Sequence, residues 1–174
     1  MKNTKLSNLV LMGLMTAMVC IGTMLIQIPV PATNGFVNIG DSIIFITSVL
    51  FGPVAGMVAG GIGSALADIL SGYAHWALFT LIIKGLEGLV VGILVKKYKN
   101  KFILSGSMIV GSIVMVVGYY IGGGILKGSF IVSLESIPWN IVQGVASTIV
   151  GVLVSSAIMK TNYMKVNKAL KNEI

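Results

Sequence analysis

Two ionisable side chains interrupt an apolar stretch of the sequence, TLIIKGLEGLVVG at residues 80–92. Lys84 and Glu87 lie about one helical turn apart, so they can face the same way and neutralise each other. An ionisable group at the centre of a bilayer costs roughly 2.5–3.5 kcal/mol, so such residues usually face a cavity or a partner. Lysine before glutamate is the less favourable order, which makes Asp41 or Asp68 an alternative partner for Lys84. The pattern leaves open whether these groups only join helices or also contact a ligand.

Amide and aromatic side chains provide a second set of candidate binding groups. Asn140 and Gln143 are about one turn apart in a predicted helix, and each amide can both donate and accept hydrogen bonds. Trp76 and Trp139 are expected at helix ends, where tryptophan serves either as an interfacial anchor or as a stacking surface for a flat ligand. For His75, the alternative to ligand contact is an exposed loop position. The remaining candidates in this set are Asn38 and Tyr73.

Several other chemistries do not fit the residues present. The chain has one cysteine and one histidine, so it cannot build an internal disulfide or a multi-histidine metal site, and we expect no metal or cofactor. The motifs H-E-x-x-H, G-x-S-x-G and G-x-x-x-x-G-K-[ST] are absent, so we expect neither an intramembrane enzyme nor an ATPase. All the basic residues behind the net charge of +7 are lysines, and without arginine we do not expect nucleic acid as a partner.

The composition is that of a membrane protein, because 56% of the residues are hydrophobic and only 10% are charged. Soluble domains carry roughly 25% charged residues. The apolar runs predict an all-α bundle of six membrane helices that forms one domain over residues 1–174. The expected spans are residues 6–28, 39–51, 53–72, 77–95, 103–126 and 135–159.

Two of these spans differ in length from an ordinary crossing or signal segment. The run 39–51 is short for a crossing and is separated from the next by Gly52 and Pro53, which predicts a short or tilted helix followed by a turn. The first run is longer than a signal-peptide core, so we expect a retained helix.

The lysines are distributed unevenly over the predicted loops. With a cytoplasmic N-terminus, six crossings place Lys127 outside and most of the other lysines inside, which satisfies the positive-inside rule. Those predicted inside are Lys2, Lys5, Lys96, Lys97, Lys99, Lys101, Lys160, Lys165, Lys168 and Lys171. We therefore expect a multi-pass protein of the cell membrane with both termini in the cytoplasm. The tail KTNYMKVNKALKNEI is either an amphipathic stretch on the inner leaflet or a solvated tail.

Small residues recur at intervals of four along the predicted spans, as is typical of helices that pack closely in a membrane. The main row is Gly56, Gly60, Ser64, Asp68 and Gly72, and similar rows are Gly88 and Gly92, and Ser147, Gly151 and Ser155. Gly13 and Ala17 form a shorter pair on the first span, where the partner could be another protein.

With this topology, the candidate polar groups from five segments fall in the outer half of the bundle. This convergence predicts an outward-facing pocket. Polar groups on one side suit solute capture better than internal alternating access, and a stand-alone secondary transporter is the alternative.

The run from Gly35 to Gly92, followed by IPWNIVQG, resembles the substrate-binding S component of an energy-coupling factor (ECF) transporter. The motifs that carry the resemblance are N-x-G-D, F-G-P-x-x-G, G-S-A-x-x-D, T-x-x-x-K-G-x-E-G and P-x-N-x-x-Q, and it extends over nearly the whole chain. Within that family, the chain is most similar to the riboflavin, hydroxymethylpyrimidine and pyridoxine types.

The resemblance implies capture of a vitamin or vitamin precursor from outside. Uptake would then need a transmembrane coupling subunit and two cytoplasmic ATPase subunits, with membrane lipid around the bundle. The family's docking surface maps to Gly13 and Ala17, although Ile21 one turn later is bulkier than the family pattern. The pocket residues that the resemblance implies are Asn38, Asp41, Asp68, Lys84, Glu87, Asn140 and Gln143.

The polar character of these candidates favours a hydroxymethylpyrimidine-like or pyridoxine-like ligand over the larger riboflavin. From the sequence we expect Lys84→Met to weaken binding at least tenfold, about 1.4 kcal/mol, and to leave the bundle folded.

Overall fold

The computed structural model describes residues 4–30, 35–96 and 100–160, and it is mostly helical. The first half contains α1 (Thr4–Leu25), β1 (Gln27–Val30), β2 (Gly35–Asn38), α2 (Gly40–Phe51) and α3 (Pro53–Leu70). The second half contains α4 (Ala77–Val95), α5 (Lys101–Lys127), α6 (Phe130–Ser133) and α7 (Ser136–Lys160). The C-terminal tail and several of the predicted inside lysines, Lys2, Lys97, Lys99, Lys165, Lys168 and Lys171, lie outside the described residues.

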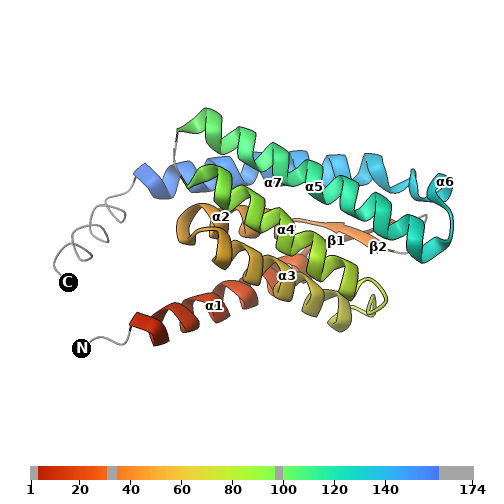
Figure 1. Cartoon of the computed structure of the whole chain (residues 1–174), viewed down its shortest axis with the longest axis horizontal. Coiled ribbons are helices and arrows are strands. Elements are labelled where there is room, and N and C mark those ends of the chain that lie inside the picture. Colours follow the sequence, from red (N-terminus) through yellow and green to blue (C-terminus); the bar gives the residue numbers. More distant parts are fainter. Residues whose placement is uncertain (1–3, 31–34, 97–99, 161–174) are drawn as a thin grey trace.

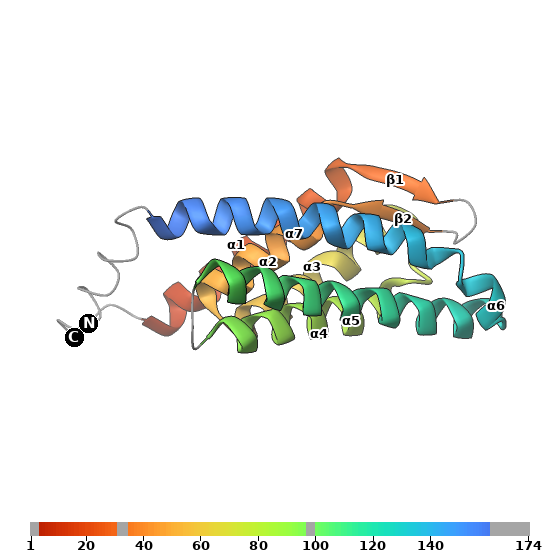
Figure 2. The same ribbon diagram turned by 90° about the horizontal axis from the view of Figure 1, so that it is seen from above.

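The chain passes back and forth along one axis (Figure 1). The start of α1, the end of α4, the start of α5 and the end of α7 lie at one end of the bundle. The strands, the turn between α3 and α4, and α6 lie toward the other end. Seen from above, β2 runs beside α7, which it contacts (Figure 2). The described lysines Lys96, Lys101 and Lys160 therefore share one end, and Lys127 lies at the other.

Five of the described helical segments are long and apolar enough to cross a membrane. The shorter α2, with 12 residues, agrees with the short helix predicted at residues 39–51. Pro53 is the first residue of α3, where its missing N–H costs nothing, and Gly52 before it has a positive φ of 93°, which glycine adopts readily. The predicted turn between these helices is confirmed.

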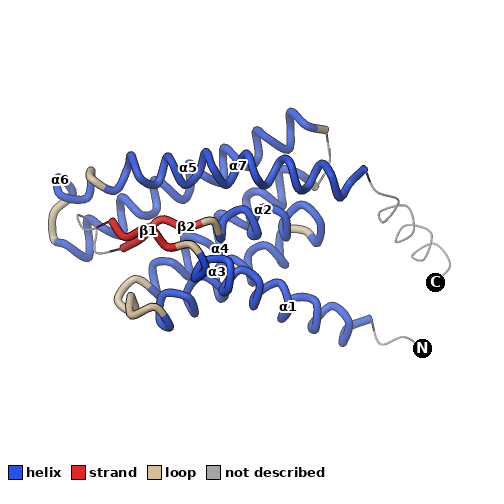
Figure 3. Tube along the Cα trace, turned by 180° about the vertical axis from the view of Figure 1, so that it is seen from behind, coloured by secondary structure: helices blue, strands red, loops and turns tan. Residues whose placement is uncertain are grey.

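The all-α prediction is wrong at one segment, where an antiparallel pair of strands follows α1 (Figure 3). The first helix ends at Leu25 instead of residue 28, and Gln27 pairs with Asn38. Pro29 explains this difference, because proline cannot donate the helical hydrogen bond but is tolerated in an edge strand. The four-residue α6 is a second departure, since a loop was expected before the last span.

Close packing of α3 against α4 confirms the prediction from the spaced small residues. A methyl group added at Gly60 would lie 2.7 Å from the carbonyl oxygen of Lys84, and one added at Gly61 would lie 2.8 Å from that of Leu81. Ser48 of α2 also donates to the carbonyl of Gly88 over 2.9 Å. This packing brings the backbone that carries Lys84 directly against α3.

The small pair on α1 has a different environment. Gly13 and Ala17 are exposed, and a methyl group added at Gly13 would meet nothing in the described chain within 4 Å. The side chain of Ile21 on the same helix is 56% exposed. The face of α1 that carries these three residues is therefore not used for packing within the described bundle.

Candidate functional site

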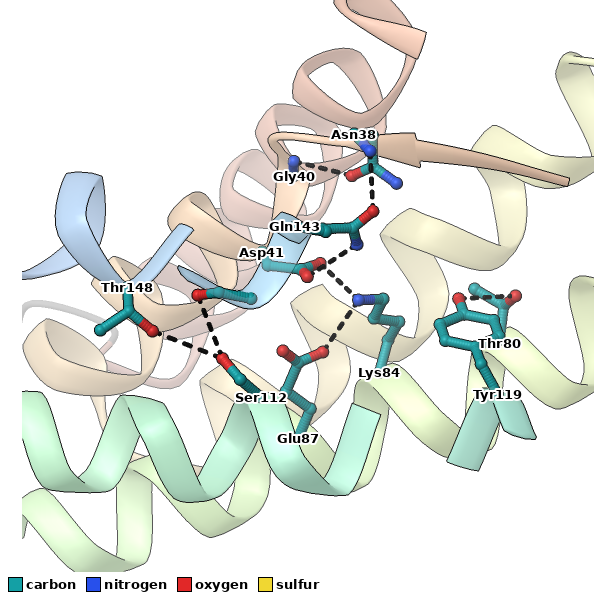
Figure 4. A network of polar contacts seen from close by, with 11 residues as sticks. Asn38, Gly40, Asp41, Thr80, Lys84, Glu87, Ser112, Tyr119, Gln143 and Thr148 are labelled. Atoms are coloured by element: carbon teal, nitrogen blue, oxygen red, sulfur yellow. Dashed lines mark hydrogen bonds and ion pairs between the residues drawn. The ribbon is translucent and has the colours of Figure 1, made fainter. Parts of the chain in front are cut away.

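A group of buried polar side chains, the buried network, joins four elements in the middle of the bundle (Figure 4). Its centre is Lys84 of α4, whose ammonium pairs with Asp41 of α2 and with Glu87, the latter over 3.0 Å between Nζ and Oε2. None of the three side chains is more than 1% exposed. Lys84 therefore binds both Asp41 and Glu87, two of the partners that the sequence left open, which explains how an ammonium is accommodated at this depth.

Gln143 of α7 connects the buried network to the strands. Its amide nitrogen donates to Oδ2 of Asp41 over 2.8 Å, and its oxygen accepts the backbone N–H of Asn38 over 2.8 Å. The side-chain oxygen of Asn38 accepts the backbone N–H of Gly40, the first residue of α2, over 2.8 Å. The network therefore consists of Asn38, Asp41, Lys84, Glu87 and Gln143, and it fixes β2 against both α2 and α7.

The electrostatics of the network follow from where its members lie. Asp41 is in the first turn of α2, where the helix dipole favours a negative charge. Nζ of Lys84 also lies 5.5 Å from the centre of the Tyr119 ring, a cation–π distance. Two carboxylates share one ammonium, and Oε1 of Glu87 has no hydrogen-bond partner in the described chain. Because all these groups are out of water, their mutual pairing is what makes their burial tolerable.

A cavity toward the strand end of the bundle adjoins this network, and we call it the outer pocket after the outward-facing pocket expected from the sequence. Its walls come from the two strands, α3, α4, α5, α7 and the turn before α4, and its space including the open mouth is about 520 Å³. It is lined by Val30, Gly35, Phe36, Val37, Asn38, Asp68, Trp76, Thr80, Tyr119, Ser136, Trp139, Asn140 and Gln143. Asn38 and Gln143 belong to both the pocket and the network.

Aromatic rings make up much of the pocket wall. Trp76 is buried and packs edge-on against Tyr119 of α5, with 5.6 Å between ring centres. Trp139 of α7 is 46% exposed, so it presents a free surface. Flat aromatic walls with a few polar groups suit a small heteroaromatic ligand.

Asp68 of α3 contributes a carboxylate to this wall. Its side chain is 5% exposed, the Thr80 side chain lies within hydrogen-bonding reach, and Oδ2 has no hydrogen-bond partner in the described chain. Thr80 in turn pairs with the hydroxyl of Tyr119 over 3.1 Å. A carboxylate can only accept, so Thr80 donates to Asp68 and Tyr119 donates to Thr80.

The structure separates the predicted site residues into three groups. Those that line the outer pocket are Asn38, Asp68, Trp76, Trp139, Asn140 and Gln143. Asp41, Lys84 and Glu87 do not line it and belong to the buried network instead. Tyr73 packs edge-on against Phe36, with 4.9 Å between ring centres, and His75 is exposed in the turn before α4; neither lines the pocket.

Three polar lining residues were missed from the sequence, namely Thr80, Tyr119 and Ser136. Thr80 lies one turn before Lys84 and could have been found from that spacing. Tyr119 lies in an apolar span with no neighbouring charge, and only the rotation of α5 brings it into the pocket. Among the described residues, no three His, Cys, Asp or Glu side chains come together in a way that could hold a metal ion.

Comparison with known proteins gives a consistent result. Residues 3–160 match the family model described as "ECF-type riboflavin transporter, S component". The chain is 31% identical over 168 residues to the thiamine precursor transporter HmpT of Lactococcus lactis subsp. cremoris, covering 94% of this chain and 95% of that protein. It is 46% identical over 133 residues to an uncharacterized protein of Pyrococcus woesei, covering 76% and 88% of the two chains.

A solved structure supports the same fold. The structure described as "Structure and mechanism of the S component of a bacterial ECF transporter" superposes with a TM-score of 0.75 and 21% sequence identity. The match covers 92% of this chain and 99% of that chain. At this level of identity the likeness concerns the fold alone.

Proposed function

Since this chain belongs to the family of ECF-type riboflavin transporter S components, we propose that it captures a hydroxymethylpyrimidine-like vitamin precursor in the outer pocket. Proteins of this family are multi-pass membrane transporter components and not enzymes. The observation that carries the proposal is the outer pocket itself, in which exposed aromatic surface at Trp139 lies near the polar groups of Asp68 and Asn140.

Two considerations support this substrate class. The relative from L. lactis, matched over nearly the full length of both chains, is described as a thiamine precursor transporter. The pocket wall also carries several polar groups for its size, which suits a small polar ring better than a flavin. A pyridoxine-like compound is the second candidate, and riboflavin, after which the family is named, is the third.

The proposal includes an orientation and a set of partners. The end that carries Lys96, Lys101 and Lys160 faces the cytoplasm, in keeping with the positive-inside rule, so the pocket end faces outward. Uptake then requires a transmembrane coupling subunit and two cytoplasmic ATPase subunits. Gly13 and Ala17, which no described part of the chain covers, would form part of the docking surface for the coupling subunit.

The substrate is tested by thermal unfolding of the purified protein with hydroxymethylpyrimidine, pyridoxine and riboflavin. We expect the largest stabilisation from hydroxymethylpyrimidine, because a ligand that binds only the folded state raises its stability. If riboflavin raised the unfolding temperature and the other two compounds did not, the proposed substrate class would be wrong. Uptake into vesicles that contain the chain without any coupling subunit would instead support a stand-alone secondary transporter.

A further inference from the structure

One buried acceptor of a residue that lines the outer pocket has no donor among the described residues. Asp68 is the only residue with a charged side chain among the described residues that line the pocket, and its Oδ2 has no hydrogen-bond partner there. An unmade hydrogen bond at a buried group costs about 1–3 kcal/mol, and more when the group is charged. A ligand that supplies a donor at this position therefore makes a hydrogen bond that the described chain does not make.

Several polar groups of the pocket wall are engaged with other partners. The hydroxyl of Thr80 can donate only once and lies beside Asp68, and the hydroxyl of Tyr119 pairs with Thr80 over 3.1 Å. Ser136 donates to the carbonyl of Ser133 over 2.7 Å, and the amide of Gln143 donates to Asp41 over 2.8 Å. No donor of the described chain bonds to Oδ2 of Asp68, so this acceptor is left for a ligand.

We infer that Asp68 is the residue that determines ligand specificity, and that it accepts a hydrogen bond from an amino group attached to the ligand's aromatic ring. This inference rests on the proposed function and narrows it to aminopyrimidines. The aromatic walls at Trp76, Tyr119 and Trp139 favour the same ligands, because a ring that gains positive charge on protonation is attracted to the faces of aromatic side chains. A compound with a carbonyl oxygen in place of the amino group would place two acceptors against each other.

The test compares hydroxymethylpyrimidine with its analogue in which the ring amino group is replaced by oxygen, a compound of nearly the same shape. Isothermal titration is carried out with the wild-type protein, Asp68→Asn and Glu135→Gln. The control removes a negative charge at an exposed position of the turn before α7, at the same end of the bundle. Since a site built to bind a ligand N–H rejects an analogue that lacks it, we expect the wild type and the control to prefer the amino compound by at least about tenfold.

Asp68→Asn is expected to reduce this preference to about threefold or less, because an amide can donate to the oxo compound as well as accept from the amino compound. Equal binding of the two compounds by the wild type would overturn the role of Asp68, as would an unchanged preference in the variant. The wild-type comparison can overturn the proposal even if the variant does not fold. Binding of riboflavin with no binding of either pyrimidine would overturn the proposed substrate class itself, which is a different failure.

Discussion

Two buried aspartates in this protein have opposite surroundings. Asp41 accepts hydrogen bonds from Lys84 and Gln143, so both of its carboxylate oxygens are engaged. Asp68 is almost as deeply buried, but its Oδ2 has no partner in the described chain, and the residue lines a pocket. The same residue type therefore joins helices at one position and remains available to a ligand at the other.

The difference shows that burial and charge alone do not identify a binding residue. A buried carboxylate with a full set of partners has nothing left to offer a ligand, whereas one with a vacant acceptor position does. Stability is therefore expected to depend mainly on the buried network, and ligand affinity mainly on the outer pocket. Substitutions in the two regions therefore test whether stability and ligand affinity depend on different residues.

The largest effect is expected from Lys84→Met. Its removal leaves Asp41 and Glu87 buried without a countercharge, and breaking a buried ion pair in this way costs about 3–5 kcal/mol. The structure therefore changes the expectation from the sequence, which was weaker binding in a folded bundle. The free energy of unfolding of the purified protein measures the effect.

Lys96→Met is the matched control, because Lys96 is exposed at the opposite end of α4 from the pocket. We expect its free energy of unfolding to change by no more than about 0.5 kcal/mol. If Lys84→Met kept its stability but lost ligand affinity, Lys84 would contact the ligand as predicted from the sequence. The expectation that the buried network determines stability and the outer pocket determines affinity would then be wrong.

An intermediate effect is expected at Gln143, which belongs to both regions. Gln143→Met leaves the backbone N–H of Asn38 and Oδ2 of Asp41 without their partner, which costs about 1–3 kcal/mol of stability. Ligand affinity should fall as well, since the same side chain lines the pocket and holds β2 in place. Thermal unfolding with and without hydroxymethylpyrimidine measures both effects.

Asn140→Leu provides the comparison, because Asn140 lines the pocket but is not part of the buried network. We expect it to lose affinity with a smaller loss of stability than Gln143→Met. If both variants lost affinity and stability in the same proportion, the pocket and the network would have to be treated as a single unit.

The helical part of the fold was predictable because hydropathy and length determine membrane spans almost alone. The expected span 77–95 coincides with α4, Ala77–Val95. The strands were missed for two reasons. Each has only four residues, which is too few to show the alternation of apolar and polar residues that is typical of a strand. The apolar residues Ile28 and Val30 also continue the apolar composition of α1.

Part of the candidate site could be predicted as a set of residues, but not its division into a buried network and a pocket. The depth of a residue follows from its position in a span, so the sequence placed Asp41, Asp68 and Lys84 in the same half of the bundle. Which carboxylate binds Lys84 depends on how the helices are rotated about their axes, and the sequence motifs do not state that rotation. The contact of Tyr119 with the pocket depends on the same quantity, so it too required the structure.

The smallest effect is expected at His75, which was predicted as a candidate from the sequence. His75 is exposed in the turn between α3 and α4 and does not line the pocket, and its ring centre lies 6.2 Å from that of Trp76. Trp76 is already held by its contact with Tyr119, so loss of the histidine ring should not move it. We therefore expect His75→Ala to change ligand affinity by no more than about twofold, as for other exposed positions.

Trp76→Leu is the matched variant for this turn, because it removes a ring that does line the pocket. We expect a loss of affinity that is several times larger than for His75→Ala, measured by titration with the same ligand. A tenfold loss in His75→Ala would mean that the turn closes over the ligand when it binds. The binding site would then include exposed residues of this turn that do not line the pocket described above. The contrast between Asp41 and Asp68 would apply only to the buried part of the binding site.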